Sequence, residues 1–143
     1  MRIEATLFVV DDDIDARDSV CALARSMGLK TESFASSEGL LAAYNVPGPA
    51  CLVVDVRLPG MSGLDLQQEL VNRGCTLPVV IVSHRIGVKE TVRAMKLGAV
   101  TVLQKPYADQ ELWAAIQNGL KQSAQYRVDR AHHNALQSRF DVL

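Results

Sequence analysis

The sequence lacks a strong net charge, a long apolar run and any paired-cysteine motif. Fifteen Lys and Arg residues against sixteen Asp and Glu residues leave a net charge of −1, so no basic field favours binding of nucleic acid by this chain. Uninterrupted apolar runs such as residues 79–82 fall far short of the roughly 18–20 residues that span a bilayer. The four apolar residues before the acidic run at residue 11 are too few for a secretory signal. We therefore expect no membrane segment and no export signal.

Cysteine and glycine are too sparse and too scattered to form known ligand motifs. The three cysteines, Cys21, Cys51 and Cys75, are odd in number and match no CxxC metal or redox pattern. Buried or inert thiols in a reducing cytoplasm are the simpler interpretation. Neither a GxGxxG nor a GxxxxGK[ST] string occurs, which excludes the usual glycine-rich phosphate loops.

Short apolar runs alternate along the chain with segments of helical spacing. The runs predict five buried strands at residues 6–10, 30–34, 51–54, 79–82 and 100–103. Ser36 and Ser62 stand in helix N-cap positions, and Gly28, Gly74 and Gly98 follow predicted helices. This (βα)5 pattern predicts an α/β fold: a doubly wound, flavodoxin-like sheet of five parallel strands in the order 2-1-3-4-5.

The fourth and fifth predicted helices contribute apolar residues to the packing of the domain. Val88, Val92, Met95 and Leu97 form the apolar stripe of the fourth helix, and Tyr107 and Trp113 are assigned to the fifth as packing residues. From about residue 123 the chain is polar, with apolar residues at helical spacing. We expect one domain over residues 1–122, followed by a linker or C-terminal helical extension over residues 123–143.

Polar residues follow four of the five predicted strands. Asp11, Asp12 and Asp13 follow the first, Asp55 the third, Ser83 the fourth and Lys105 the fifth. Ligands of open α/β sheets bind beyond the carboxyl ends of the strands. We therefore expect these side chains to meet at one edge of the sheet.

This residue set indicates phosphoryl transfer onto an aspartate. Clustered carboxylates disfavour their own ionisation unless a cation joins them, and Mg2+ prefers such oxygen ligands. A carboxylate can attack a phosphoryl group as a nucleophile. Ser83, Lys105 and Mg2+ could then stabilise the charge that develops on the phosphoryl oxygens.

Five separate strings resemble one known family: FVVDDD, LVVDVRLPGMSG, VVIVS, AMKLGA and QKPY. They are similar, in order and spacing, to the receiver domain of two-component response regulators over about residues 5–120. The resemblance implies that Asp55 accepts a phosphoryl group from a sensor histidine kinase. It implies that Asp11, Asp12, Asp55 and the backbone carbonyl of Arg57 hold Mg2+. It also implies that Ser83 and Lys105 contact the phosphoryl oxygens, and that the Lys105–Pro106 peptide is cis.

Within this family the chain most resembles the FixJ/NarL class of transcriptional regulators. The resemblance rests on AMKLGAVTVLQKPY and on a tail that ends ALQSRFDVL. In that class a receiver domain, here residues 1–122, leads through a linker into a helix-turn-helix domain. We expect phosphorylation to promote a homodimer through helix 4, strand 5 and helix 5. DNA would be contacted only through the helix-turn-helix domain, which this chain does not contain. The protein would be a switch with at most slow self-dephosphorylation, and not an enzyme.

Three features depart from the family pattern. His84 follows Ser83 where a small residue is usual, and Val102 stands where an aromatic switch residue is usual. Three placements of the His84 imidazole are open: it crowds the site, it contacts the phosphoryl group when charged, or it turns to solvent. Arg57 and Arg85 lie two residues beyond Asp55 and Ser83, where they could retain phosphate or pair with acids such as Asp13.

Two other functions fit part of the sequence. Asp11-x-Asp13 matches the start of a haloacid dehalogenase-type phosphatase, although that reading gives Asp55 no role. A pseudo-receiver with an inert site, used only for protein contacts, fits the unusual His84 and Val102. An EF-hand is excluded because Ala16 and Ala22 replace the required Gly and Glu. His132 and His133 are too isolated to indicate a metal site.

Overall fold

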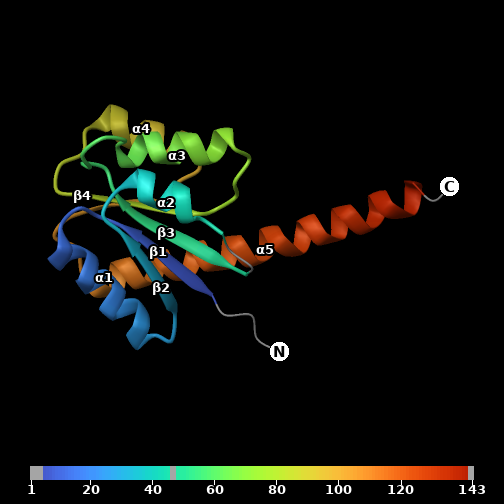
Figure 1. Cartoon of the computed structure of the whole chain (residues 1–143), viewed down its shortest axis with the longest axis horizontal. Helices are drawn as coiled ribbons and strands as arrows, with labels where there is room; N and C mark the ends of the chain where they lie inside the picture. The colour runs from blue at the N-terminus through green and yellow to red at the C-terminus, as the bar shows by residue number, and fades with distance from the viewer. Residues whose placement is uncertain (1–4, 46–47, 142–143) are drawn as a thin grey trace.

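The computed structural model describes residues 5–45 and 48–141, with side chains as far as residue 132. Within these residues five strands alternate with five helices along the chain (Figure 1). The elements are β1 (Thr6–Val10), α1 (Ile14–Ser26), β2 (Lys30–Phe34), α2 (Ser37–Ala43), β3 (Ala50–Asp55), α3 (Gly63–Asn72), β4 (Val79–Ser83), α4 (Val88–Lys96), β5 (Thr101–Gln104) and α5 (Asp109–Asp141). The predicted Ser36 and Ser62 caps are confirmed, since each hydroxyl accepts from an amide three residues on.

The strands form one parallel sheet in the order β2-β1-β3-β4-β5, which confirms the predicted fold. The three central strands are buried throughout. The prediction that all five are buried is wrong for β2 and β5, whose residues are only partly covered. Their place at the two edges of the sheet explains this, because an edge strand has a neighbour on one side only.

Helices cover both faces of the sheet. α2, α3 and α4 pack on one face, where Phe8 and Val10 point, and α1 and α5 pack on the other face, against Leu7 and Val9 (Figure 1). Burial of these apolar side chains is the main term that stabilises the fold.

The fourth helix buries little of its predicted apolar stripe. Ala94 is its buried residue, whereas Val88 is 82% exposed and Met95 is 47% exposed. α4 packs on α3 and on the edge strand β5, beyond which the sheet has no further strand. Part of the stripe therefore lies on the surface.

The fifth helix continues past the sheet as a single element that projects from the body of the molecule (Figure 1). Gly119 lets it approach β3, where burial raises the pKa of the Cys51 thiol to about 12. Ser123 is buried, and its hydroxyl accepts a hydrogen bond of 3.0 Å from the amide of Ala50. The first residue of the expected extension is thus fastened to the start of β3. In the described part of the chain no helix is both long and apolar enough to cross a membrane.

Candidate functional site

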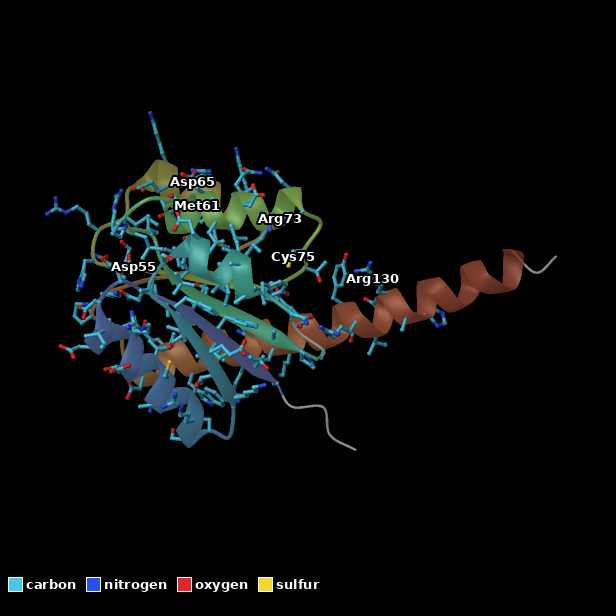
Figure 2. All side chains as sticks on the ribbon, viewed as in Figure 1. Asp55, Met61, Asp65, Arg73, Cys75 and Arg130 are labelled. Atoms are coloured by element: carbon cyan, nitrogen blue, oxygen red, sulfur yellow. The ribbon has the colours of Figure 1, made fainter. Side chains whose placement is uncertain are left out.

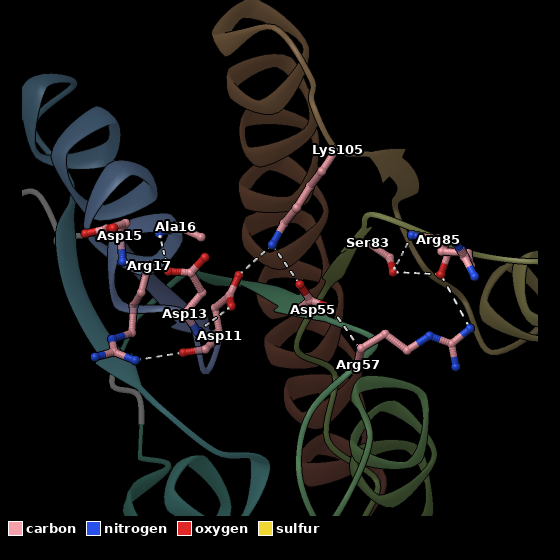
Figure 3. Close-up of polar contacts among 10 residues, drawn as sticks. All are labelled: Asp11, Asp13, Asp15, Ala16, Arg17, Asp55, Arg57, Ser83, Arg85 and Lys105. Atoms are coloured by element: carbon pink, nitrogen blue, oxygen red, sulfur yellow. Dashed lines mark hydrogen bonds and ion pairs between the residues drawn. The ribbon is translucent and has the colours of Figure 1, made fainter.

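Two buried carboxylates and one lysine meet at the carboxyl edge of the sheet. Asp11 follows β1 and Asp55 ends β3, and they are 4% and 6% exposed. The Lys105 ammonium, from the segment after β5, donates to Asp11 Oδ2 at 2.8 Å and to Asp55 Oδ2 at 2.7 Å (Figure 3). Figure 2 shows Asp55 at the end of the sheet opposite the projecting part of α5, which carries Arg130. The structure therefore brings together three of the residues selected from the sequence.

The lysine stays charged in this setting. Burial lowers the pKa of Lys105, but the hydrogen bonds and charges of Asp11 and Asp55 outweigh it, so the pKa lies above its ordinary value. The Lys105–Pro106 peptide is cis, as the family resemblance implies. Tyr107 follows in the same loop, where burial raises its pKa. The assignment of Tyr107 to the fifth helix is wrong, because α5 begins only at Asp109.

The remaining oxygen of each carboxylate is held by a backbone amide two residues further on. Asp11 Oδ1 accepts from the amide of Asp13 at 3.0 Å, and Asp55 Oδ1 accepts from the amide of Arg57 at 2.8 Å. Each carboxylate is therefore fixed at both oxygens, one by the local backbone and one by Lys105. This arrangement leaves a lone pair on each oxygen for a further ligand.

Other predicted site residues lie nearby but outside this bridge. Asp12 is exposed beside Asp11, and it makes no hydrogen bond or ion pair with the described residues. Ser83 is fully buried at the end of β4, yet its hydroxyl donates to the Arg85 carbonyl oxygen at 2.9 Å and not to Asp55 (Figure 3). To contact a group on Asp55, the Ser83 hydroxyl would have to leave this partner.

The structure also shows where the residues that depart from the family pattern lie. His84 is exposed and Val102 is partly buried on β5. Of the two roles suggested for the arginines, pairing with an acid holds for Arg57, but the acid is Glu90 and not Asp13. The Arg57 guanidinium donates to Glu90 Oε1 at 2.8 Å and to the Arg85 carbonyl oxygen at 3.4 Å, whereas Asp13 caps α1.

Two glutamates near the site were missed from the sequence. Glu90 on α4 binds Arg57, and Glu38 on α2 accepts from the amide of Met61 at 2.7 Å. That hydrogen bond is the main reason why the pKa of Glu38 lies below its usual value. Both residues contact the segment that follows Asp55. Glu90 stands at the capping spacing from Gly87, but neither this spacing nor any other local pattern indicates a contact of either glutamate with the loop after β3.

The acidic residues are compatible with a magnesium ion. In residues 5–45 and 48–132 no group of three or more His, Cys, Asp or Glu side chains is arranged to hold a metal. Asp11 and Asp55, however, set two negative charges against the single charge of Lys105 in a buried site. Mg2+ commonly takes only one or two carboxylates and completes its shell with water and phosphate oxygens. The donor set fits that requirement.

The fold and this acidic edge define a class of protein, and comparison with known families identifies it. A family model for the response regulator receiver domain matches residues 7–117. The chain belongs to this family, so it is a receiver domain of the response regulators of two-component systems.

The relatives include transcriptional regulators of the FixJ type, which the sequence resembles. The chain is 40% identical over 140 residues to nodulation protein W of Bradyrhizobium diazoefficiens, a match that covers 98% of this chain and 62% of that protein. It is 39% identical over 117 residues to the transcriptional regulatory protein FixJ of Azorhizobium caulinodans, covering 82% of this chain and 56% of FixJ. The solved structure of the response regulator StyR aligns with a TM-score of 0.91 and 37% identity, over 97% of this chain and 70% of that one. The chain thus spans about three fifths of the length of nodulation protein W.

Proposed function

We propose that Asp55 is the phosphoryl acceptor of a signalling switch, and that the donor is the phosphohistidine of a sensor histidine kinase. The observation that carries the proposal is the bridge from Asp11 through Lys105 to Asp55, at the carboxyl edge of a receiver sheet. A carboxylate of this kind is nucleophilic, and the adjacent cation offsets the negative charge of an incoming phosphate.

The transfer is a displacement at phosphorus. An oxygen of the Asp55 carboxylate forms the new P–O bond while the P–N bond to the donor imidazole breaks. The imidazole nitrogen leaves with the electron pair and takes up a proton, and Asp55 becomes an acyl phosphate. Lys105, whose Nζ lies 2.7 Å from Asp55 Oδ2, neutralises charge on the phosphoryl oxygens. Ser83 donates to one of these oxygens after its hydroxyl turns away from the Arg85 carbonyl.

Magnesium is part of the proposal. Asp11, Asp12, Asp55 and the backbone carbonyl of Arg57 would hold Mg2+, and the bound ion would supply positive charge to the phosphoryl oxygens. The uncompensated negative charge of the Asp11 and Asp55 pair supports this. The chain's own residues orient the acceptor oxygen, because Lys105 and the Arg57 amide fix the Asp55 carboxylate from two sides.

The output of the switch is proposed from the surface and from the relatives. We assign residues 1–122 to the receiver unit and residues 123–143 to a linker that connects to a DNA-binding domain in the cytoplasm. The relation to FixJ, a transcriptional regulatory protein, supports this arrangement. Phosphorylation would promote a homodimer through α4, β5 and α5. The exposed apolar residues of α4, Val88, Val92 and Met95, support such a contact.

The test is covalent labelling by a small phosphodonor. The wild-type chain is incubated with acetyl phosphate and Mg2+, and its intact mass is followed beside Asp55→Asn and Asp11→Asn. We expect phosphorylated wild-type protein, no label on Asp55→Asn, and loss of labelling when Mg2+ is chelated. Label that persists in Asp55→Asn but disappears in Asp11→Asn would instead support the haloacid dehalogenase-type chemistry.

A second experiment separates a working site from an inert one, a distinction raised by His84 and Val102. Binding of Mg2+ to the folded protein raises its unfolding free energy by about 1.4 kcal/mol when the Mg2+ concentration is ten times the Kd. We therefore expect the melting temperature to rise with Mg2+ concentration in the wild type and not in Asp11→Asn. A melting temperature that ignores Mg2+ would support a pseudo-receiver that serves only protein contacts.

A further inference from the structure

The two ends of the loop that follows the acceptor Asp55 are joined by a backbone hydrogen bond. This loop, residues 56–62, joins β3 to α3. The amide of its second residue, Arg57, donates to Asp55 Oδ1 at 2.8 Å. Where the loop closes, the amide of Gly63 donates to the Val56 carbonyl oxygen at 3.0 Å, and a Cβ at Gly63 would overlap the backbone carbonyl of Asp55. The position of the loop therefore sets the orientation of the Asp55 carboxylate.

Two glutamates from separate helices fasten this loop at opposite ends. Glu38, in the first turn of α2, accepts from the amide of Met61 at 2.7 Å. Glu90, in the first turn of α4, accepts from the Arg57 guanidinium at 2.8 Å and from the amide of Gly87 at 3.2 Å. One glutamate thus holds the end of the loop next to α3, and the other holds the residue whose amide binds Asp55.

We propose that Glu38 and Glu90 are positioning residues for phosphoryl transfer to Asp55. The inference rests on the proposed function, because it concerns the efficiency of that same transfer. Neither carboxylate touches the acceptor. Both act through the loop: they keep the Arg57 amide in place, and that amide holds one oxygen of Asp55 while Lys105 holds the other.

Small displacements of the acceptor are expected to slow the reaction because the attacking oxygen must lie in line with the bond that breaks. Glu90 has an additional route to the site. The Arg57 guanidinium that it holds also donates to the Arg85 carbonyl oxygen at 3.4 Å, and the Ser83 hydroxyl donates to the same oxygen at 2.9 Å. The Glu90–Arg57 pair therefore connects the loop after β3 with the loop after β4, which carries Ser83.

These contacts are expected to contribute little to the stability of the fold. The Arg57 side chain is 59% exposed in its pair with Glu90, and Glu38 lies on the surface. Exposed ion pairs contribute little to stability. The rate of transfer and the stability of the fold can consequently be separated by experiment, because removal of either glutamate should change the rate more than the melting temperature.

The experiment measures the rate constant of phosphorylation by acetyl phosphate, at saturating Mg2+ and over a range of donor concentrations. An Asp55 oxygen attacks phosphorus, the P–O bond to the acetyl group breaks, and acetate leaves with the electron pair. The variants are Glu38→Ala, Glu90→Ala and the corresponding Gln substitutions. Asp65→Ala is the matched control, since it removes an exposed ion pair of 3.1 Å between α3 and α4 that does not touch the loop.

We expect each Ala variant to lower the maximal rate constant about three- to tenfold, with the donor concentration for half-maximal rate unchanged. Glu38→Gln should recover most of the rate because an amide oxygen can still accept from Met61. Asp65→Ala should behave as the wild type. Hydrogen exchange gives an independent readout: the Arg57 amide should lose protection in both Ala variants, while the Asp13 amide, which makes the same bond to Asp11, should keep it.

Several results would overturn the inference. Unchanged rates and unchanged Arg57 protection in both Ala variants would show that the glutamates do not position the loop. Rates that fall equally in Asp65→Ala, in step with the melting temperature, would show a general loss of stability. A wild-type chain that takes no label would instead refute the proposed function, and Arg57 exchange would then still report whether the glutamates hold the loop.

Discussion

The loops after β1 and β3 carry the two buried carboxylates but are held in different ways. In both loops the carboxylate accepts a hydrogen bond from the backbone amide two residues later: Asp11 from Asp13, and Asp55 from Arg57. After β1 the chain enters α1 at once, and Asp13 caps this helix by accepting from the amide of Asp15 at 3.0 Å. After β3 the chain makes the loop 56–62, which is held by Glu38 and Glu90 from other helices. Apart from the bonds of Asp11 with Phe34 and Lys105, the first loop is held by its sequence neighbours, whereas the second is held by side chains of other helices.

This contrast has a consequence for the site. On the Asp11 side, the Asp13 amide and the Arg17 guanidinium bind Asp11 from within six residues, and the long-range contacts are those of Asp11 with Phe34 and Lys105. The Asp55 side needs α2 and α4 in place, because its partners lie 23 and 33 residues away in sequence. Substitutions in the two loops should therefore have different effects on the unfolding free energy and on the rate of phosphorylation.

The largest expected loss of unfolding free energy follows substitution of Gly63, where the loop after β3 ends. Gly63→Ala places a methyl group against the Asp55 carbonyl, so the backbone must shift, and we expect a loss of about 2–3 kcal/mol of unfolding free energy. Gly87→Ala is the control, since a Cβ there meets only Glu90 Oε1 at 3.8 Å, and it should cost about 1 kcal/mol or less. Chemical denaturation measures both. Equal losses would show that the loop after β3 is not closely packed at Gly63.

A smaller effect is expected at the locally held loop. Asp13→Ala removes the N-cap of α1 but keeps the amide that binds Asp11, so it should cost about 1 kcal/mol of unfolding free energy. The rate of phosphorylation by acetyl phosphate should stay within about twofold of wild type because the Asp55 side is untouched. A rate that falls as far as in Glu90→Ala would remove the distinction between the two loops.

The smallest expected effect depends on pH. The Met61 amide lowers the pKa of Glu38 in the folded protein, so the carboxylate stabilises the fold above its unfolded pKa of about 4.5. This contribution disappears as the pH falls through the lower, folded value. We expect the difference in unfolding free energy between wild type and Glu38→Gln to shrink between neutral pH and about pH 3. A constant difference, or a Met61 amide chemical shift that does not follow the titration of Glu38, would contradict the contact.

The sequence was sufficient for those features that depend on neighbours in the chain. The central strands are continuous apolar runs, and Ser36 and Ser62 stand directly before the helices that they cap. The acidic edge was also predictable, since the ends of parallel strands share one side of a sheet, and Asp11 and Asp55 come directly after or at the end of strands.

The features that were missed depend on which elements become neighbours in space. Glu90 stands three residues after the N-cap Gly87, a spacing that indicates a helix start but not a partner for Arg57. Asp13, the acid suggested as a possible partner of the arginines, is engaged at the start of α1. The exposure of Val88 could not be read from helical spacing because the same stripe serves a buried or a surface helix. Whether the apolar stripe of α4 is buried depends on which elements pack against it at the edge of the sheet, and helical spacing does not contain that information.

The most direct test of the central claim is to locate the phosphorylated residue chemically. The wild-type chain is phosphorylated with acetyl phosphate and Mg2+, the acyl phosphate is reduced with borohydride, and the peptides are sequenced by mass spectrometry. The account predicts homoserine at position 55 and unmodified aspartate at positions 11, 12 and 13. Homoserine at position 11 or 13 in place of position 55 would contradict it.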